Sequence, residues 1–253
     1  MKNRIFRISA FARRCLLELV RDPLAYVFAL GFPLVMLVVM TLLNESIPPE
    51  AGMEIFRIDR LAPAVYVFGL SFLMLFTAIL VSKDRAEAFL VRLYISPMQR
   101  ADFLLGYTLP VLGLAVGQGI VTMLCTAVIG KITDVPLTFG GMALSLAVSL
   151  PAVILFVGFG LLFGTLFGDK TAPPLSSVVI SLASFLGGMW MDLSQMEGAI
   201  VTISVLLPFY HAVSAARMAM TLEFEGILPH LAVTAGWAAA VYLLAIASFR
   251  KKV

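Results

Sequence analysis

Charged residues are scarce in this 253-residue chain, and their scarcity sets its class. Asp, Glu, Lys and Arg make up 13% of the residues, hydrophobic residues make up 61%, and the mean hydropathy is +1.02. A soluble domain carries about 25% charged residues, so this chain has too few to cover a water-facing surface. It is also too apolar to be disordered. The composition predicts an integral membrane protein.

The chain also lacks the short motifs of common enzyme classes. It contains no GxxxxGK[ST] phosphate loop, no HExxH, no CxxC and no GxSxG. Its two cysteines, Cys15 and Cys125, are too few for a disulfide framework or a metal site. We therefore expect no catalytic residue, no metal and no cofactor on this chain, and no nucleic-acid partner.

Six stretches have no Asp, Glu, Lys or Arg, and each exceeds the roughly 20 residues that cross about 30 Å of hydrocarbon as a helix. The uncharged stretches are 23–44, 61–82, 103–130, 135–168, 171–191 and 226–249. We predict an all-α membrane protein with one transmembrane domain over 1–253. Its six predicted spans are about 24–43, 62–82, 103–129, 140–167, 173–191 and 228–249.

The basic residues predict the orientation. With six spans, 14 of the 18 Lys and Arg residues fall on the side of both termini, which we expect to be the cytoplasmic side of a plasma membrane. A seventh uncharged stretch, 198–216, contains Pro208 and His211. If it also crossed the membrane, the bias would fall to 12 against 6. We therefore predict an outer re-entrant element at 198–216, before the last span.

The N-terminal segment 1–22 has the pattern of a basic amphipathic helix. Its apolar residues recur every three or four positions, and its arginines gather on another face. Asp22 and Pro23 then suit the N-cap and first position of the next helix. We expect 1–22 to lie in the inner interface, either as an anchor that sets the topology or as an elbow that transmits motion into the first span.

The largest inner loop, from Ser82 to Phe103, contains a second amphipathic pattern. Between Lys83 and Ile95 apolar residues again recur at helical spacing, and Ser96-Pro97 resembles a new helix start. The pattern predicts a short helix that is either an interfacial connector or a docking helix for a soluble partner. None of the six spans contains an ionisable carboxylate or ammonium group, so energy for transport would come from another subunit.

At this loop the sequence resembles the permeases of ABC-2 type ATP-binding-cassette exporters. Their first inner loop reads approximately E-R-x-x-G-T-x-x-x-L-x-x-[ST]-P. Here Asp84-Arg85, Leu93 and Ser96-Pro97 occupy the matching positions, and Ala88-Phe89 replaces G-T. A later L-x-P-x-x-x-x-x-x-x-x-R pattern is similar to the segment that holds Pro208 and Arg217.

The resemblance implies a channel-forming subunit that pairs with a second permease copy or paralogue and with two cytoplasmic ABC ATPase subunits. ATP and Mg would then be held by the ATPase partner. The helix 84–95 would be the coupling helix, and the inner turn 169–170 a smaller second contact or simply a capped turn. The implied ATPase-coupling residues are Asp84, Arg85, Phe89, Leu90, Leu93, Asp169 and Lys170.

A stripe of serines marks the fifth predicted span. Polar side chains in a membrane helix face protein or a cavity, so the stripe predicts helix–helix hydrogen bonds, a partner permease or a pore. This pore or partner-permease face comprises Ser177, Ser181, Ser184, Phe185, Met189 and Trp190.

A predicted outer gate comprises Pro208, Phe209, Tyr210, His211 and Arg217. These apolar and aromatic side chains suit an amphiphilic drug, peptide or lipid-like substrate. The competing hypotheses are an ATP-independent channel or carrier and a membrane enzyme that uses Asp192 and His211.

Overall fold

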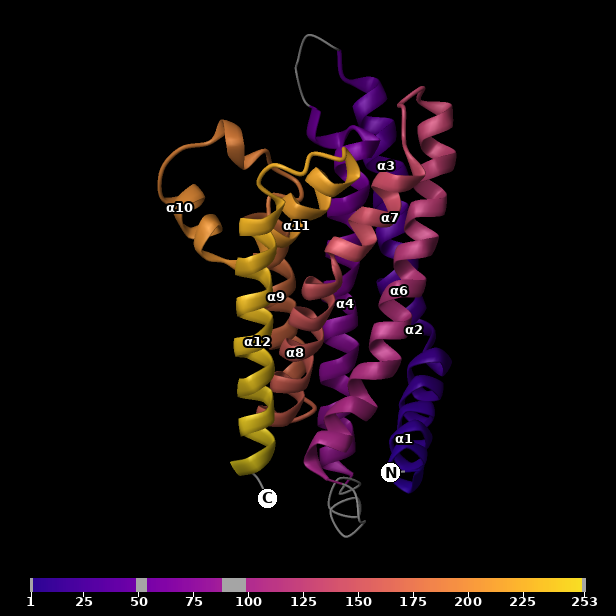
Figure 1. The fold of residues 1–253 in the computed structure, drawn as a ribbon, viewed down its shortest axis with the longest axis vertical. Coiled ribbons are helices and arrows are strands. Elements are labelled where there is room, and N and C mark those ends of the chain that lie inside the picture. The colour runs from indigo at the N-terminus through magenta and orange to yellow at the C-terminus, as the bar shows by residue number, and fades with distance from the viewer. Residues whose placement is uncertain (1, 49–53, 88–98, 252–253) are drawn as a thin grey trace.

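The structure is a computed structural model that describes residues 2–48, 54–87 and 99–251, and within these ranges it is helical with no β-strand (Figure 1). Both ends of the chain lie at one end of the helix bundle, together with the end of α4 and the start of α6. We call this the terminal end and the opposite one the distal end. The elements are α1 (Lys2–Arg21), α2 (Pro23–Tyr26), the π-helix η1 (Val27–Gly31), α3 (Phe32–Ser46), the 3-10 helix η3 (Glu54–Phe56), α4 (Ile58–Ala86), α6 (Arg100–Ile132), α7 (Phe139–Val148), α8 (Leu150–Leu166), α9 (Ala172–Leu186), the 3-10 helix η4 (Leu193–Gln195), α10 (Ala199–Leu206), α11 (Pro208–Met220) and α12 (Ile227–Lys251).

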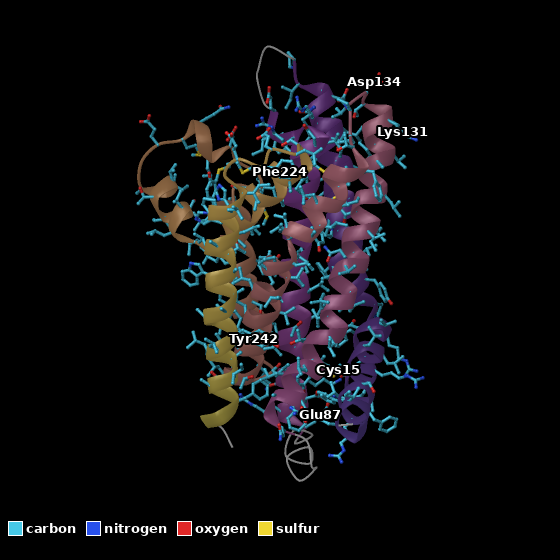
Figure 2. All side chains as sticks on the ribbon, viewed as in Figure 1. Cys15, Glu87, Lys131, Asp134, Phe224 and Tyr242 are labelled. Atoms are coloured by element: carbon cyan, nitrogen blue, oxygen red, sulfur yellow. The ribbon has the colours of Figure 1, made fainter. Side chains whose placement is uncertain are left out.

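Five helices are long and apolar enough to cross a membrane, and the bent pair α10–α11 would make a sixth if it counted as one span. The five are Pro23–Ser46, Ile58–Ala86, Ala101–Ile132, Phe139–Leu166 and Ile227–Phe249. Charged side chains gather near the ends of these helices, with Glu87 at the terminal end and Lys131 and Asp134 at the distal end (Figure 2). The chain is therefore an all-α, multi-pass membrane protein, as the sequence predicted.

The fifth predicted span, 173–191, is shorter in the structure. Its helix α9 has 15 residues, or about 22 Å of rise, less than the roughly 30 Å hydrocarbon thickness. The helix ends before Gly187 and Gly188, and Gly188 has a φ of +66°. A glycine in this left-handed conformation commonly terminates a helix, so the predicted end at 191 was wrong by five residues.

The segment after α9 contains two short helices that meet at a bend of 80°. Pro208 occupies the first turn of α11, where proline needs no amide hydrogen bond. In Figure 1 the pair lies toward the distal end, between the end of α9 and the start of α12. The pair covers most of the stretch 198–216, and its re-entrant course stays a prediction.

Helix α4 is the centre of the bundle. In its apolar window 89% of the residues are buried, against 22% in the first and last spans. Helix α8 lies close to it because Gly160 and Gly164 have no side chains there. A Cβ atom on Gly160 would lie 2.6 Å from the Met74 carbonyl oxygen, and one on Gly164 2.8 Å from that of Ala78. Small residues commonly allow such close approach between membrane helices.

Substituting Gly160→Ala should therefore push α8 away from α4. The added methyl group meets backbone, so we expect a loss of about 1–3 kcal/mol in stability, as for overpacked cores. Thermal unfolding of the purified protein in detergent measures the change. Gly113→Ala is the matched control, because a Cβ atom there has no neighbour within 4 Å. Equal stability of the two variants would show that the α4–α8 contact is looser than described.

Candidate functional site

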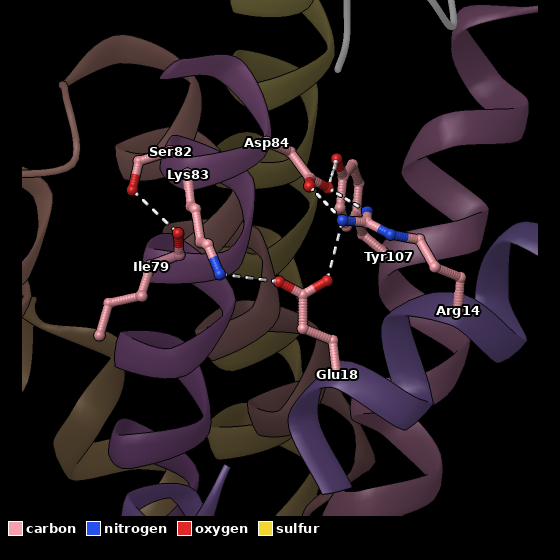
Figure 3. A network of polar contacts seen from close by, with 7 residues as sticks. All are labelled: Arg14, Glu18, Ile79, Ser82, Lys83, Asp84 and Tyr107. Atoms are coloured by element: carbon pink, nitrogen blue, oxygen red, sulfur yellow. Dashed lines mark hydrogen bonds and ion pairs between the residues drawn. The ribbon is translucent and has the colours of Figure 1, made fainter. Parts of the chain in front are cut away.

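A buried carboxylate joins three helices at the terminal end. Asp84, in the last turn of α4, is 1% exposed. Arg14 of α1 donates hydrogen bonds to its two oxygens at 2.5 and 2.6 Å, and the Tyr107 hydroxyl of α6 donates a third at 2.7 Å (Figure 3). A buried carboxylate is tolerated when it is paired and hydrogen-bonded. This site therefore holds α1, α4 and α6 together.

Glu18 extends the same network toward solvent. Its carboxylate lies 2.8 Å from Arg14 and 3.5 Å from the Lys83 ammonium group (Figure 3). Both Glu18 and Lys83 are substantially exposed, and exposed ion pairs contribute only about 0–1 kcal/mol. The bond between Arg14 and Asp84 is the main electrostatic link.

Apolar packing and a second ion pair fix the rest of α1 against α6. The Phe11 ring packs edge-on against Tyr107 with centroids 4.9 Å apart, and a Cβ on Gly106 would overlap the same ring. Near the N-terminus, Arg4 donates to Asp102 at 2.8 Å. The predicted amphipathic helix is thus present as α1. Part of its surface packs against α6, so it does not contact lipid alone.

Burial and charge shift the pKa values of two neighbours on α1. The hydrogen bond from Arg14 to Asp84 raises the pKa of the guanidinium above its ordinary value, so this cation stays charged. Burial raises the pKa of the Cys15 thiol to about 12, against the lowering effect of Arg14. At neutral pH Cys15 is therefore a protonated packing residue, because the thiolate is the reactive form.

Helix α6 begins three residues later than the Ser96-Pro97 pattern predicted. Its N-cap is Gln99, and the Gln99 amide donates to the Asp102 carboxylate at 2.9 Å while the Gln99 side chain bonds the backbone of Asp102. This reciprocal capping box satisfies two amides at the helix start. Asp102 thus anchors both the first turn of α6 and Arg4.

The predicted coupling residues separate into two groups. Asp84 is buried as described, and Arg85 donates to the Thr165 carbonyl at the end of α8, so both side chains make bonds within the chain. A coupling role for Asp84 and Arg85 stays a prediction. The remaining loop residues Phe89, Leu90 and Leu93 lie outside the described residues.

The second predicted contact, Asp169-Lys170, forms an exposed turn between α8 and α9. The Lys170 amide donates to the Asp169 carboxylate at 3.0 Å, and the Thr171 amide donates to the Gly168 carbonyl. Both side chains face solvent at the terminal end. A coupling role for this pair stays a prediction.

The predicted gate residues lie in α11 and connect it to four other helices, α4, α8, α10 and α12. Phe209 stacks on Phe156 of α8 with centroids 5.8 Å apart. Arg217 donates through Nε to the Arg60 carbonyl at 3.0 Å. His211 lies 2.8 Å from the Val205 carbonyl oxygen and 2.7 Å from His230 Nδ1. The Tyr210 ring contacts both imidazoles. A gating function for these residues stays a prediction.

The predicted pore or partner face on α9 is divided by the structure. Ser177, Ser181 and Phe185 are exposed on the outside of this chain. Ser184 is 6% exposed and Met189 0% exposed, so neither reaches that surface. Trp190 packs edge-on against Phe68 of α4, with centroids 5.4 Å apart. The serine spacing alone did not reveal this, because only tertiary packing shows which side of the stripe contacts α4.

A buried amide in the middle of α6 was missed by the search for charged groups. Gln118 is 3% exposed, and neither its nitrogen nor its side-chain oxygen has a hydrogen-bond partner among the described residues. It lies against Gly69 of α4, where a Cβ atom would be 1.6 Å from the amide nitrogen. Buried polar groups without partners are rare and costly, so Gln118 marks a destabilised point of the bundle.

The comparison with protein families agrees with this architecture. The model of the ABC-2 type transporter family matches residues 7–221, which spans α1 through α11. This chain belongs to the ABC-2 type transporter family. No curated protein matches it. Membership makes the chain the permease subunit of an ABC transporter, and permeases of this family work with ABC ATPase partners.

Removing the charge at Asp84 should weaken the joint between α1, α4 and α6. Asp84→Asn removes the buried counter-charge of Arg14 and leaves only the partly exposed Glu18. We expect a loss of about 2–3 kcal/mol, below the range for a fully buried pair, because Arg14 is one-third exposed and keeps this second partner. Thermal unfolding in detergent measures it. Glu18→Gln removes a charge from the same network and should cost less than about 1 kcal/mol; a larger loss there would contradict the assignment.

Replacing Gln118 with an apolar residue of similar size should stabilise the permease. Gln118→Leu removes two unpartnered polar atoms, so we expect a gain of about 1–3 kcal/mol, seen as a higher thermal midpoint. Gln118→Glu keeps the shape but puts an ionisable carboxyl group without a partner in place of the neutral amide, so it should give no gain. A fall in stability with Gln118→Leu would mean that the amide is hydrogen-bonded in the folded protein.

Proposed function

We propose that this permease is the membrane-spanning subunit of an ATP-driven exporter that moves an amphiphilic compound out across the plasma membrane. A separate ATPase subunit would hold ATP and Mg and supply the energy. The observation that carries this proposal is the set of bonds around the loop between α4 and α6. Asp84 joins the end of α4 to α1 and α6, and Arg85 joins it to α8. A force applied to that loop would reach four helices together.

Orientation follows from the charge distribution. With six spans, 14 of the 18 Lys and Arg residues of the sequence fall on the side of both termini, and this bias supports placing that side in the cytoplasm. The loop between α4 and α6 would then face a cytoplasmic ATPase. The exposed turn at Asp169-Lys170 lies at the same end and would be the second contact.

A second permease copy or paralogue would complete the pathway. The outer surface of α9 exposes Ser177 and Ser181 next to Val178, Leu182 and Phe185. Serine hydroxyls on a membrane helix favour a protein or cavity environment over lipid. We place the partner permease or the pore on this surface. The apolar residues beside the serines favour an amphiphilic drug, peptide or lipid-like substrate over a hydrophilic polymer.

The competing functions have less support. A membrane enzyme would use Asp192 and His211, but both ring nitrogens of His211 already lie within hydrogen-bond distance of groups in this chain, the Val205 carbonyl and His230. This leaves the imidazole poorly placed to act as a free general base. An ATP-independent channel or carrier would lack the ionisable intramembrane groups that usually couple ion movement.

Co-purification with the ATPase subunit tests the coupling assignment. Phe89→Asp combined with Leu93→Asp should abolish or strongly reduce the complex, because charge replaces the predicted apolar docking stripe. The matched control is Leu222→Asp with Phe224→Asp, which makes the same exchanges in the distal loop after α11. Retention of the ATPase by the loop variant would overturn the docking role.

Flux measurements separate the exporter from a passive channel. Liposomes that contain the permease and the ATPase should transport an amphiphilic probe only with ATP. Flux through liposomes that hold the permease alone would instead support the channel. The ATPase can be found as the product of a neighbouring gene that encodes a GxxxxGK[ST] loop.

A further inference from the structure

A cavity of about 620 Å³ lies between α1 and the terminal-end half of α4. Its rim is polar and includes Glu18, Arg21 and Lys83, while Leu17, Phe76 and Leu80 form apolar walls. The Glu18–Lys83 pair at its edge is visible in Figure 3. The cavity thus has a charged mouth and a hydrophobic interior, which is the character of a site for an amphiphile.

Two cations at the rim can bind another group. Arg14 is engaged by Asp84 and Glu18, but the Lys83 ammonium lies 3.5 Å from Glu18, beyond ordinary hydrogen-bond distance, and its side chain is 53% exposed. The structure assigns the Arg21 guanidinium no ion pair or side-chain hydrogen bond with a described residue. Of the two carboxylates in the lining, Glu18 pairs with Arg14 and Asp22 accepts from the Leu24 amide. Arg21 and Lys83 are therefore the lining cations placed to meet an anion.

The apolar side of the cavity continues deeper into the bundle. Leu19 and Phe76 also line a second cavity of about 50 Å³, whose other walls include Ala25 and Ala29 of the first span and Leu73 of α4. Helix α1 exposes further apolar side chains nearby, with Phe6 at 73% and Leu17 at 39% exposure. This surface suits the headgroup boundary of a bilayer, where an amphipathic helix places its apolar side in lipid.

We propose that the cleft between α1 and α4 binds an anionic phospholipid of the leaflet that surrounds α1. Arg21 and Lys83 hold the phosphate, and the first part of an acyl chain lies against Phe76 and Leu80 toward Leu19. Basic pockets between helices at a membrane surface recognise such headgroups. The lipid contacts α1 and α4 beside the Arg14–Asp84 bond, so it reinforces the same joint. The proposal does not depend on which compound the permease transports.

Native mass spectrometry of the purified permease tests the site with two lipids that have the same acyl chains, phosphatidylglycerol and phosphatidylcholine. The native protein should retain phosphatidylglycerol preferentially. Arg21→Gln combined with Lys83→Gln should lower that retention about tenfold or more, as expected for the loss of two basic side chains near an anionic lipid. Arg13→Gln combined with Lys131→Gln removes the same charge from exposed positions outside the cleft and should leave it unchanged.

A thermal-shift measurement provides the second readout. Phosphatidylglycerol should raise the unfolding midpoint of the native protein and of the Arg13/Lys131 control, because a ligand stabilises the state that binds it. It should not raise that of the Arg21/Lys83 variant, whose midpoint in phosphatidylcholine should equal the native one. Glycerol 3-phosphate should give no shift and no competition.

Three results would overturn the proposal. They are equal retention of the two lipids by the native protein, an equal loss of phosphatidylglycerol from the control variant, and displacement of the lipid by glycerol 3-phosphate. The second would indicate diffuse surface charge, and the third a site for a soluble phosphate.

Discussion

The bond between Arg14 and Asp84 is the constraint on which the terminal end of this permease depends. Asp84 is buried on the most buried helix of the bundle, where an ionised carboxylate is stable only with a close counter-charge. Arg14 supplies that charge from α1, and Tyr107 adds a hydrogen bond from α6. The N-terminal helix is therefore part of the folded bundle. Both interpretations of segment 1–22, the anchor and the elbow that transmits motion, stay predictions.

Polar contacts and aromatic packing occur at both ends of the bundle. At the terminal end, ion pairs and helix caps such as that of Gln99 and Asp102 hold the start of α6 and the end of α4 in place. At the distal end, aromatic stacking of Phe209 on Phe156 and the contact between His211 and His230 hold the bent pair against its neighbours. The middle of the bundle packs instead through glycines and apolar side chains, as Gly160 of α8 does against α4.

The class of the protein, its long spans and its family followed from local patterns. Long uncharged stretches predict membrane helices because each charge in hydrocarbon is costly, and the matches at Asp84-Arg85 and Pro208 indicated the family that the comparison then showed. Boundaries were less accurate. Gly187-Gly188 ended α9 early, and Gln99 rather than Ser96 capped α6. Gly187-Gly188 and Gln99 are both visible in the sequence as possible helix ends. Other residues nearby are equally suitable as caps, and only the packed structure shows which residue ends or begins each helix.

The sequence by itself determined that this chain is a helical membrane permease without a phosphate loop. Hydropathy and charge are properties of local stretches of sequence, so they predict spans without knowledge of which residues contact one another. Tertiary structure decided which charged side chains work inside the protein. Nothing in the sequence distinguishes Arg14 from the other arginines of α1, or places Tyr107 beside Asp84. Nor does it divide the α9 serines into exposed Ser177 and Ser181 and buried Ser184. The Arg14–Asp84 bond, for example, joins residues 70 positions apart, which only the packing of helices brings together.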